Sequence, residues 1–164
     1  MMPSTVYIAS VGRRWRPKKH MGALNMIRIP RTPDSYAREL GVRIRIGWVP
    51  DGAWGSYDAD LHVVTLRPGL GPLQLLCTLM HELGHAAYRH RGRSRRQERE
   101  ANTWAAVRLI SKKDFIDAYL ERQDAIGIAH RLGVLPDVVE HYIMALTKAE
   151  RESLAELLRA RLVA

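Results

Sequence analysis

The sequence predicts an α+β protein, in which a small N-terminal antiparallel sheet is followed by a mainly helical region. The segment VRIRIGW, residues 42–48, alternates apolar and polar side chains, as a half-buried strand does. After residue 70 the apolar residues recur at helical rather than strand spacing. The chain has 164 residues, which is enough for one domain with a sizeable core.

The N-terminal elements can be placed from their ends. Residues 33–40 resemble a short helix that ends at Gly41, because glycine readily adopts the left-handed conformation of a helix C-terminus. The strand at residues 42–48 follows. A hairpin is expected to turn around residues 58–60, with its second strand over residues 61–66.

Helices fill the remainder of the chain. Gly71-Pro72 is a helix-start signal, since proline at the first helical position loses no needed hydrogen bond, and this helix is expected to end near Gly92. Residues 94–97 have the spacing of a capping box for the next helix, which runs to about Ile110. Four further helices are expected over residues 113–120, 122–132, 136–146 and 148–162.

The composition excludes several classes of protein. No apolar run approaches the roughly 20 residues that cross a membrane, so no membrane partner is expected. The N-terminal charges follow the apolar stretch, which is the wrong order for a secretory signal. The single cysteine, Cys77, excludes an internal disulfide framework and is expected to pack in the core. We therefore expect a cytoplasmic protein.

The net charge of +9 favours weak, non-specific affinity for nucleic acid or another acidic partner. Basic residues cluster at residues 13–19 and 89–96, and a solvated surface is the alternative for both runs. Residues 1–25 carry many charges without a sustained period, which favours a flexible basic arm. Residues 26–164 are expected to form a single domain.

The pentapeptide HELGH, residues 81–85, has the spacing of a catalytic zinc site. Residues four apart lie on one face of a helix, so His81 and His85 can bind the same ion. Glu82 borders that face and could take a proton from a metal-bound water. The alternative is a chance match in an ordinary helix. Gly84 argues against chance, because it costs about 1 kcal/mol inside a helix and suggests close packing there.

A two-histidine site needs a third protein ligand, and the next helix offers Glu98 and Glu100. We favour Glu98, because it shares a helix face with small residues suited to close packing. Asn102, one turn further on, could orient a ligand histidine through a hydrogen bond. The alternative for Glu98 is a glutamate favoured at the first turn by the helix dipole.

Two segments together resemble the ImmA/IrrE family of zinc metallopeptidases: TLMHELGHAA, and EREANTWAAVRLI with its E-x-x-A-N motif. The resemblance covers roughly residues 27–146 and implies a zincin-like metallopeptidase domain. It implies one zinc ion bound by His81, His85 and Glu98, Glu82 as general base, and Asn102 hydrogen-bonded behind the ligands.

Family members are typically cytoplasmic, and many lie in phages and mobile elements and cleave a repressor. The resemblance therefore implies a protein substrate, with a transcriptional repressor as the candidate. One departure from the family is that the connection from His85 to Glu98 is short and arginine-rich. This departure concerns the shape of the substrate cleft.

Residues 122–146 also fit a helix-turn-helix-like pair of helices. The alternative function is therefore a DNA-binding regulator with a structural or vestigial metal site. The second helix begins with Asp137 and contains Glu140, which suits a phosphate-lined groove poorly, and only His141 and Tyr142 could reach bases. We favour a packing role for this pair.

The sequence offers candidates for two further features of the proposed reaction. The group that stabilises the oxyanion cannot be chosen among six side chains: Tyr57, His62, Tyr88, His90, His130 and His141. A bound peptide is expected to add to a sheet edge, for which residues 61–66 are the candidate strand.

Overall fold

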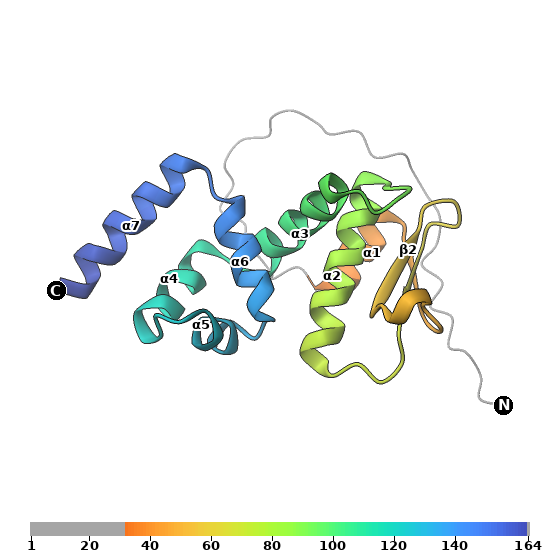
Figure 1. Ribbon diagram of the computed structural model, residues 1–164, viewed down its shortest axis with the longest axis horizontal. Helices are drawn as coiled ribbons and strands as arrows, with labels where there is room; N and C mark the ends of the chain where they lie inside the picture. Colours follow the sequence, from red (N-terminus) through yellow and green to blue (C-terminus); the bar gives the residue numbers. More distant parts are fainter. Residues whose placement is uncertain (1–31, 164) are drawn as a thin grey trace.

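The structure is a computed structural model that describes residues 32–163 (Figure 1). The predicted basic arm, residues 1–25, lies outside the described residues. The described chain forms α1 (Pro33–Leu40), β1 (Arg43–Ile46), the single-turn helix η1 (Pro50–Gly52), β2 (Gly55–Asp58), β3 (Val63–Leu66), α2 (Pro72–Tyr88), α3 (Arg95–Leu109), α4 (Lys112–Glu121), α5 (Ala125–Leu132), α6 (Pro136–Ala145) and α7 (Lys148–Val163). The predicted α+β class is confirmed. None of the described helices is long and apolar enough to cross a membrane.

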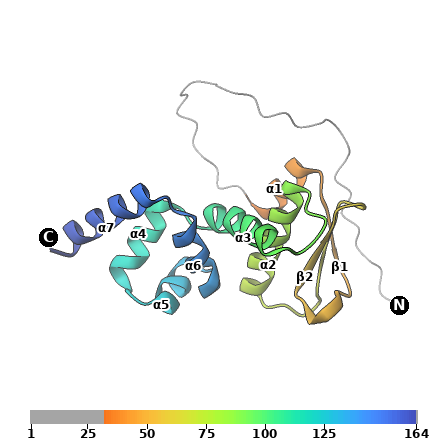
Figure 2. The same cartoon turned by 45° about the horizontal axis from the view of Figure 1, so that its top comes forward.

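The strands lie at one end of the molecule and α4 to α7 at the other, with α2 and α3 between them (Figure 1, Figure 2). One hydrophobic cluster joins the sheet, α1, α2 and α3, and includes Val64 and Leu83. A second cluster joins α3 to the C-terminal helices. Neighbouring residues of α3 belong to different clusters, Ala105 to the first and Ala106 to the second. Helix α3 therefore connects the two halves.

The sheet is mixed, not wholly antiparallel as predicted. Its order is β1-β3-β2, with β1 parallel and β2 antiparallel to β3. Alternation of side chains reports which face of a strand is buried, but not which strand lies beside it. All four residues of β3 are buried, as expected of a central strand. The prediction that residues 61–66 form the edge strand is wrong, because β1 and β2 are the edges of the described sheet.

The hairpin between β2 and β3 turns where the sequence predicts. Asp58 pairs with Val63, and the Asp58 carboxylate accepts hydrogen bonds from the backbone N–H groups of Asp60 and Leu61, both at 2.9 Å. A side chain that bonds its own backbone two residues on is a common turn device. The turn is therefore fixed by hydrogen bonds within it. The connection from β1 to β2, in contrast, crosses the end of β3, which lies between them in the sheet.

Local capping groups set most helix boundaries. Helix α1 ends at Gly41, whose φ of 70° is left-handed, and α3 begins after Ser94 and Gln97 exchange capping-box hydrogen bonds. Helix α2 ends at Tyr88 rather than near Gly92, because Arg89 already adopts a left-handed φ of 54°. Helix α5 begins after the capping residue Asp124, later than the predicted residue 122.

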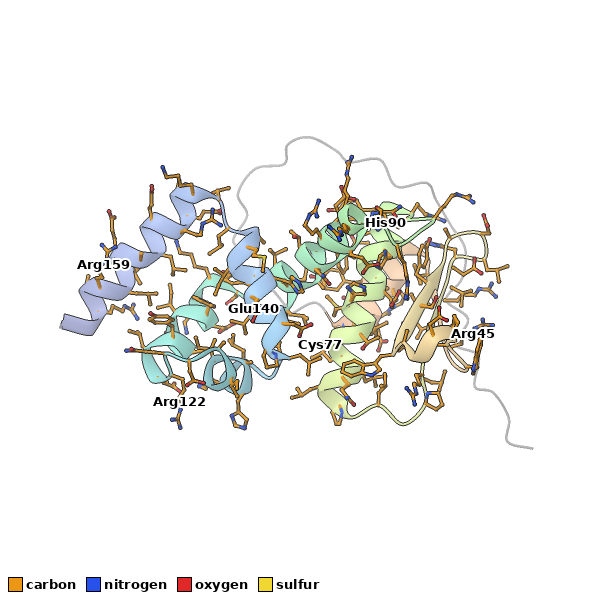
Figure 3. The ribbon with its side chains drawn as sticks, viewed as in Figure 1. Arg45, Cys77, His90, Arg122, Glu140 and Arg159 are labelled. Atoms are coloured by element: carbon orange, nitrogen blue, oxygen red, sulfur yellow. The ribbon has the colours of Figure 1, made fainter. Side chains whose placement is uncertain are left out.

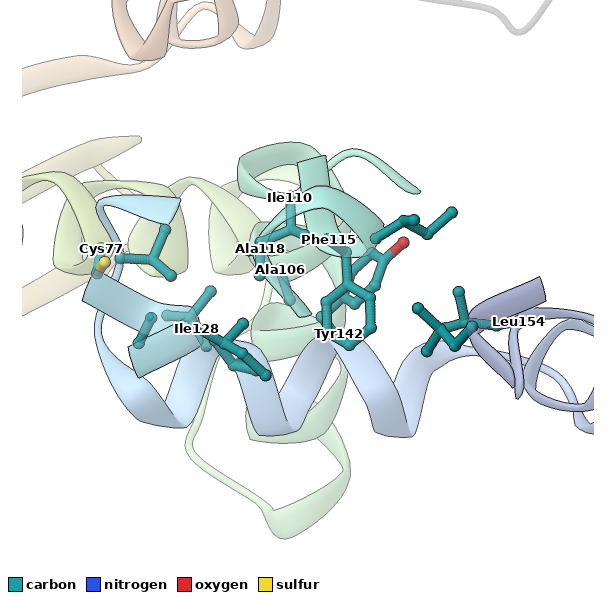
Figure 4. Close-up of a cluster of buried hydrophobic side chains, with 14 residues drawn as sticks. Cys77, Ala106, Ile110, Phe115, Ala118, Ile128, Tyr142 and Leu154 are labelled. Atoms are coloured by element: carbon teal, nitrogen blue, oxygen red, sulfur yellow. The ribbon is translucent and has the colours of Figure 1, made fainter. Parts of the chain in front are cut away.

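The core of the helical half is shown in Figure 4. Phe115 packs against Tyr142 with ring centroids 5.2 Å apart, and Ile110 and Leu154 extend the same cluster. The predicted core position of Cys77 is confirmed, since its thiol is buried and accepts a hydrogen bond from the Leu135 N–H at 3.4 Å. This contact ties α2 to the start of α6.

Candidate metal centre

Three predicted ligands come together between α2 and α3. The Nε2 atoms of His81 and His85 lie 3.1 Å apart. Glu98 Oε2 lies 3.4 Å from His81 Nε2, and Glu98 Oε1 lies 3.6 Å from His85 Nε2. Donors bound tetrahedrally to one zinc ion at its usual bond lengths are about 3.4 Å apart. Two imidazoles and a carboxylate at this spacing could hold a metal ion. Glu100, the alternative ligand, lies elsewhere and accepts a hydrogen bond from His90.

Gly84 allows the two helices to approach closely enough for this arrangement. A Cβ at position 84 would lie 2.7 Å from the Ala101 carbonyl oxygen and 2.8 Å from its Cα. No side chain fits at these distances, and Ala101 is itself fully buried. Glu98 lies one turn before Ala101, so the close contact carries Glu98 toward the histidines.

Asn102 lies in hydrogen-bonding contact with His81, the first of the two histidines. The Asn102 amide nitrogen faces His141 Nε2 at 3.2 Å, and the amide oxygen faces His81 Nδ1 at 2.7 Å. An amide nitrogen only donates and an amide oxygen only accepts, so His81 Nδ1 carries the hydrogen. The Nε2 lone pair of His81 is therefore free to bind a metal ion. His141, from α6, completes this chain of contacts.

His90, one of the oxyanion candidates, lies against the His85 ring on the side away from His81. The Nδ1 atoms of His90 and His85 are 3.0 Å apart, and the His90 side chain is buried. Burial lowers the pKa of His85 to about 3, with the neighbouring His81, His90 and Arg93 adding to the effect. Burial also lowers the pKa of His81, against the opposing charge of Glu98. Both rings are therefore neutral near pH 7, as metal ligands must be.

Glu82 is almost fully buried, with 3% of its surface exposed. Burial raises the pKa of Glu82 to about 7, although the nearby charge of Arg93 opposes this shift. The backbone of β2 fixes its position: a Cβ on Gly55 would lie 2.9 Å from Glu82 Cγ and 3.1 Å from its Oε1, and the Tyr57 backbone hydrogen-bonds the carboxylate. A carboxyl group with a pKa near 7 can both take and return a proton.

Two clefts meet at Glu82 and Arg93. The first, of about 340 Å³, lies between β2, α2, α3 and α6, and contains His81, Glu98 and His141 on its walls. The second, of about 380 Å³, lies between β2 and the loop that joins α2 to α3. Arg93 separates them, because its guanidinium donates a hydrogen bond to the Gly55 carbonyl at 3.2 Å. Together the clefts follow the edge of β2.

The six oxyanion candidates are separated by their surroundings. His141 lines the cleft that contains His81, Glu82 and Glu98. The Tyr57 hydroxyl is hydrogen-bonded to His62 at 2.8 Å, His62 also contacts the Leu40 carbonyl, and Tyr88 stacks on His90. His130 is exposed on α5. His141 is thus the candidate whose position relative to the ligands suits the role.

The helix-turn-helix-like pair, α5 and α6, turns through Gly133 in a left-handed conformation. The inner side chains of α6 pack in the core, since Val139 is fully buried and Tyr142 is 4% exposed. His141 is hydrogen-bonded to Asn102. The two side chains of α6 that were candidates for reaching DNA bases therefore contact the protein itself, which favours the packing role.

The fold and the site together define a zincin-like arrangement, with a three-stranded sheet beside an HExxH helix and a glutamate, the candidate third ligand, on the next helix. The profile of the IrrE N-terminal-like domain family of peptidases matches residues 37–144, and the chain belongs to this family.

The fold is also similar to that of a Mycobacterium tuberculosis transcriptional regulator, with a TM-score of 0.50 and 20% sequence identity. The similarity covers 71% of this chain and 42% of the regulator, so this chain spans less than half of that protein. No curated protein matches the chain.

Proposed function

We propose that the protein is a zinc-dependent endopeptidase that hydrolyses peptide bonds of a protein substrate. The observation that carries the proposal is the convergence of donor atoms from His81, His85 and Glu98 beside the buried carboxylate of Glu82. Two histidines and a glutamate with an open fourth position are a known donor set of catalytic zinc sites. Membership of a peptidase family supports the same assignment.

The donor set fits zinc better than calcium or magnesium, because two of its three donors are imidazole nitrogens. A zinc ion bound there would polarise the scissile carbonyl and lower the pKa of a bound water. Asn102 would keep the His81 ring in its binding orientation through the 2.7 Å hydrogen bond.

Glu82 is the proposed general base. Its carboxylate would take a proton from the attacking water and pass it to the nitrogen of the leaving peptide. Contact with Gly55 and the backbone of Tyr57 restricts where that carboxylate can lie, which favours one productive position. The His141 ring, on the wall of the same cleft, is our candidate for the group that meets the developing oxyanion.

The substrate would bind as an extended strand along β2. Edge strands recognise peptides through main-chain hydrogen bonds, and β2 is the edge that borders both clefts. The Gly55 carbonyl accepts its hydrogen bond from Arg93, so a paired strand could use this carbonyl only after displacing the guanidinium. This assignment replaces the edge predicted from the sequence.

The family resemblance suggests a cytoplasmic setting and a transcriptional repressor as substrate. Residues 26–164 would act as one domain, and residues 122–146 would serve packing. Basic residues, including the arm at residues 1–25, would give only weak, non-specific nucleic-acid binding.

Elemental analysis and one substitution test the proposal together. Protein purified without chelator should hold about one zinc per chain, as a site with three protein ligands does. Glu82→Gln should keep the zinc but lose hydrolysis of casein or of a repressor encoded beside the gene, because an amide cannot accept the proton. Glu140→Gln, on an exposed position of α6, is the matched control. Absence of zinc, or wild-type hydrolysis by Glu82→Gln, would contradict the proposal.

A further inference from the structure

We propose that His90 and Glu100 are positioning residues for His85. They form a hydrogen-bonded chain that fixes which nitrogen of the His85 ring carries the hydrogen and therefore which nitrogen faces Glu98. The inference rests on the proposed metal site but not on peptidase activity. Neither residue belongs to the ligand set predicted from the sequence, and Glu100 was considered there only as an alternative ligand.

Three hydrogen-bonding contacts form this chain. His85 Nδ1 lies 3.0 Å from His90 Nδ1, and His90 Nε2 lies 3.1 Å from Glu100 Oε2. The other Glu100 oxygen accepts a hydrogen bond from Arg96 Nε at 2.9 Å. His85 and His90 are 4% and 8% exposed, so water competes little for the contact between them.

The direction of each hydrogen bond follows from the carboxylate. An ionised carboxylate only accepts, so His90 Nε2 must carry the hydrogen that it shares with Glu100. A neutral His90 ring then has a lone pair at Nδ1, and His85 Nδ1 has to donate to it. The remaining nitrogen of His85, Nε2, is left with a lone pair, 3.1 Å from the Nε2 of His81. Two lone pairs that face each other at this distance favour a cation between them.

The backbone holds His90 in place for this task. Arg89 takes a left-handed φ of 54° at the end of α2, which turns the chain back toward His85. The His90 N–H then donates to the His85 carbonyl at 3.0 Å, and the Tyr88 ring stacks on His90 with planes 14° apart. Figure 3 labels His90 at this end of α2, beside the start of α3.

His81 has a different partner, which makes an internal comparison possible. Its Nδ1 donates to the Asn102 amide oxygen, and so its orientation does not depend on His90. A substitution at position 90 should therefore change the ring of His85 and leave the ring of His81 as it is. A general loosening of the site would change both.

The test compares two variants of similar size at position 90. His90→Leu removes the acceptor for His85 Nδ1–H and should lower zinc affinity about 10- to 100-fold, measured by competition with a chelating dye. His90→Asn can offer its amide oxygen as the acceptor and should keep most of the affinity. Nitrogen-15 NMR of the metal-free protein at pH 8 should find hydrogen on His85 Nδ1 in the wild type and in His90→Asn, but not predominantly in His90→Leu.

Controls separate this role from packing. Tyr88→Leu removes the stacking contact but no hydrogen bond of the chain, so both readouts should change much less than in His90→Leu. The proposed positioning role is contradicted if His90→Leu keeps the wild-type zinc affinity and the Nδ1 hydrogen of His85. It is also contradicted if the NMR signals of the His81 and His85 rings change together. Should His90→Leu not fold, Glu100→Leu on the partly exposed start of α3 gives the same two readouts.

The result is also distinct from the fate of the proposed function. A protein that binds zinc but cleaves nothing would leave the affinity comparison fully informative. A protein that binds no zinc would contradict the metal site, and the NMR measurement on the metal-free chain would still decide whether His90 sets the His85 ring.

Discussion

The two histidines of the candidate metal centre are supported by different parts of the molecule. His81 is held through Asn102, which also contacts His141 on α6 in the helical half. His85 is held through His90 and Glu100, from the loop after α2 and the first turns of α3. One ligand therefore depends on how the C-terminal helices pack, and the other on a short loop. The site belongs to both halves of the protein.

The largest expected effect is the loss of the metal ion. Glu98→Ala removes one of three donors and should reduce zinc from about one per chain to a trace, by elemental analysis after dialysis. Glu100→Ala, in the same helix, should retain far more zinc than Glu98→Ala under the same dialysis, because Glu100 supports His85 through His90 but supplies no donor atom itself. The reverse pattern would show that the third ligand has been chosen wrongly.

The next largest effect is a loss of hydrolysis without a loss of zinc, which distinguishes the role of Glu82 from that of the metal ligands. In Gly55→Ala the new Cβ would lie 2.6 Å from Thr78 Cγ2 and 2.9 Å from Glu82 Cγ, so the carboxylate must move. A displacement of this kind should lower the rate of casein hydrolysis by about 100-fold while zinc is retained.

Gly47→Ala is the matched control for that variant, because its Cβ would lie at an ordinary 3.5 Å from Thr65. Equal activities of the two variants would mean that β2 does not position the carboxylate.

A smaller effect is expected where α2 and α3 touch. Gly84→Ala places a Cβ 2.7 Å from the Ala101 backbone, and we expect a loss of about 1–3 kcal/mol in the free energy of unfolding. Zinc affinity should fall as well, because Glu98 moves with α3. Gly92→Ala, in the loop, meets only the flexible Gln97 side chain at 3.4 Å and serves as control. Urea denaturation and dye competition measure both quantities, and an unchanged Gly84→Ala would refute the close contact.

The smallest expected effect concerns DNA. Since His141 contacts Asn102 and Tyr142 is buried, neither should read bases. Binding to random duplexes should be weak, should fall steeply with salt and should show no preferred sequence. Selection of one defined site at physiological salt, lost in His141→Ala, would instead favour the regulator hypothesis. Tyr142→Ala is unsuitable for this purpose because it should destabilise the core.

Sequence reasoning succeeded where the signal was local. Ser94 and Gly41 mark helix boundaries through their own hydrogen bonds or dihedral angles, and the structure has helix ends at both. His81 and His85 lie on one helix at fixed spacing, so their proximity needs no knowledge of the tertiary fold. Glu98 could be chosen over Glu100 because it shares the face of α3 whose small residues were expected to pack against α2.

Features that depend on distant contacts were missed. The central position of β3 arises from a crossover that alternation does not encode, and so the edge strand was misplaced. His90 carried no sequence signal, because its contact with His85 depends on a left-handed turn at Arg89, a residue that rarely adopts it. The position of His141 beside Asn102 required the packing of α6 against α3.

The hydrogen bond from Arg93 to the Gly55 carbonyl has a kinetic consequence for the proposed peptidase. A peptide paired with β2 on both sides of Glu82 has to take over that carbonyl, so the guanidinium must leave first. Capture would then be a two-step process, with an association rate below that of simple docking. Short peptides confined to one cleft would bind without this step, so the association rate should fall with peptide length.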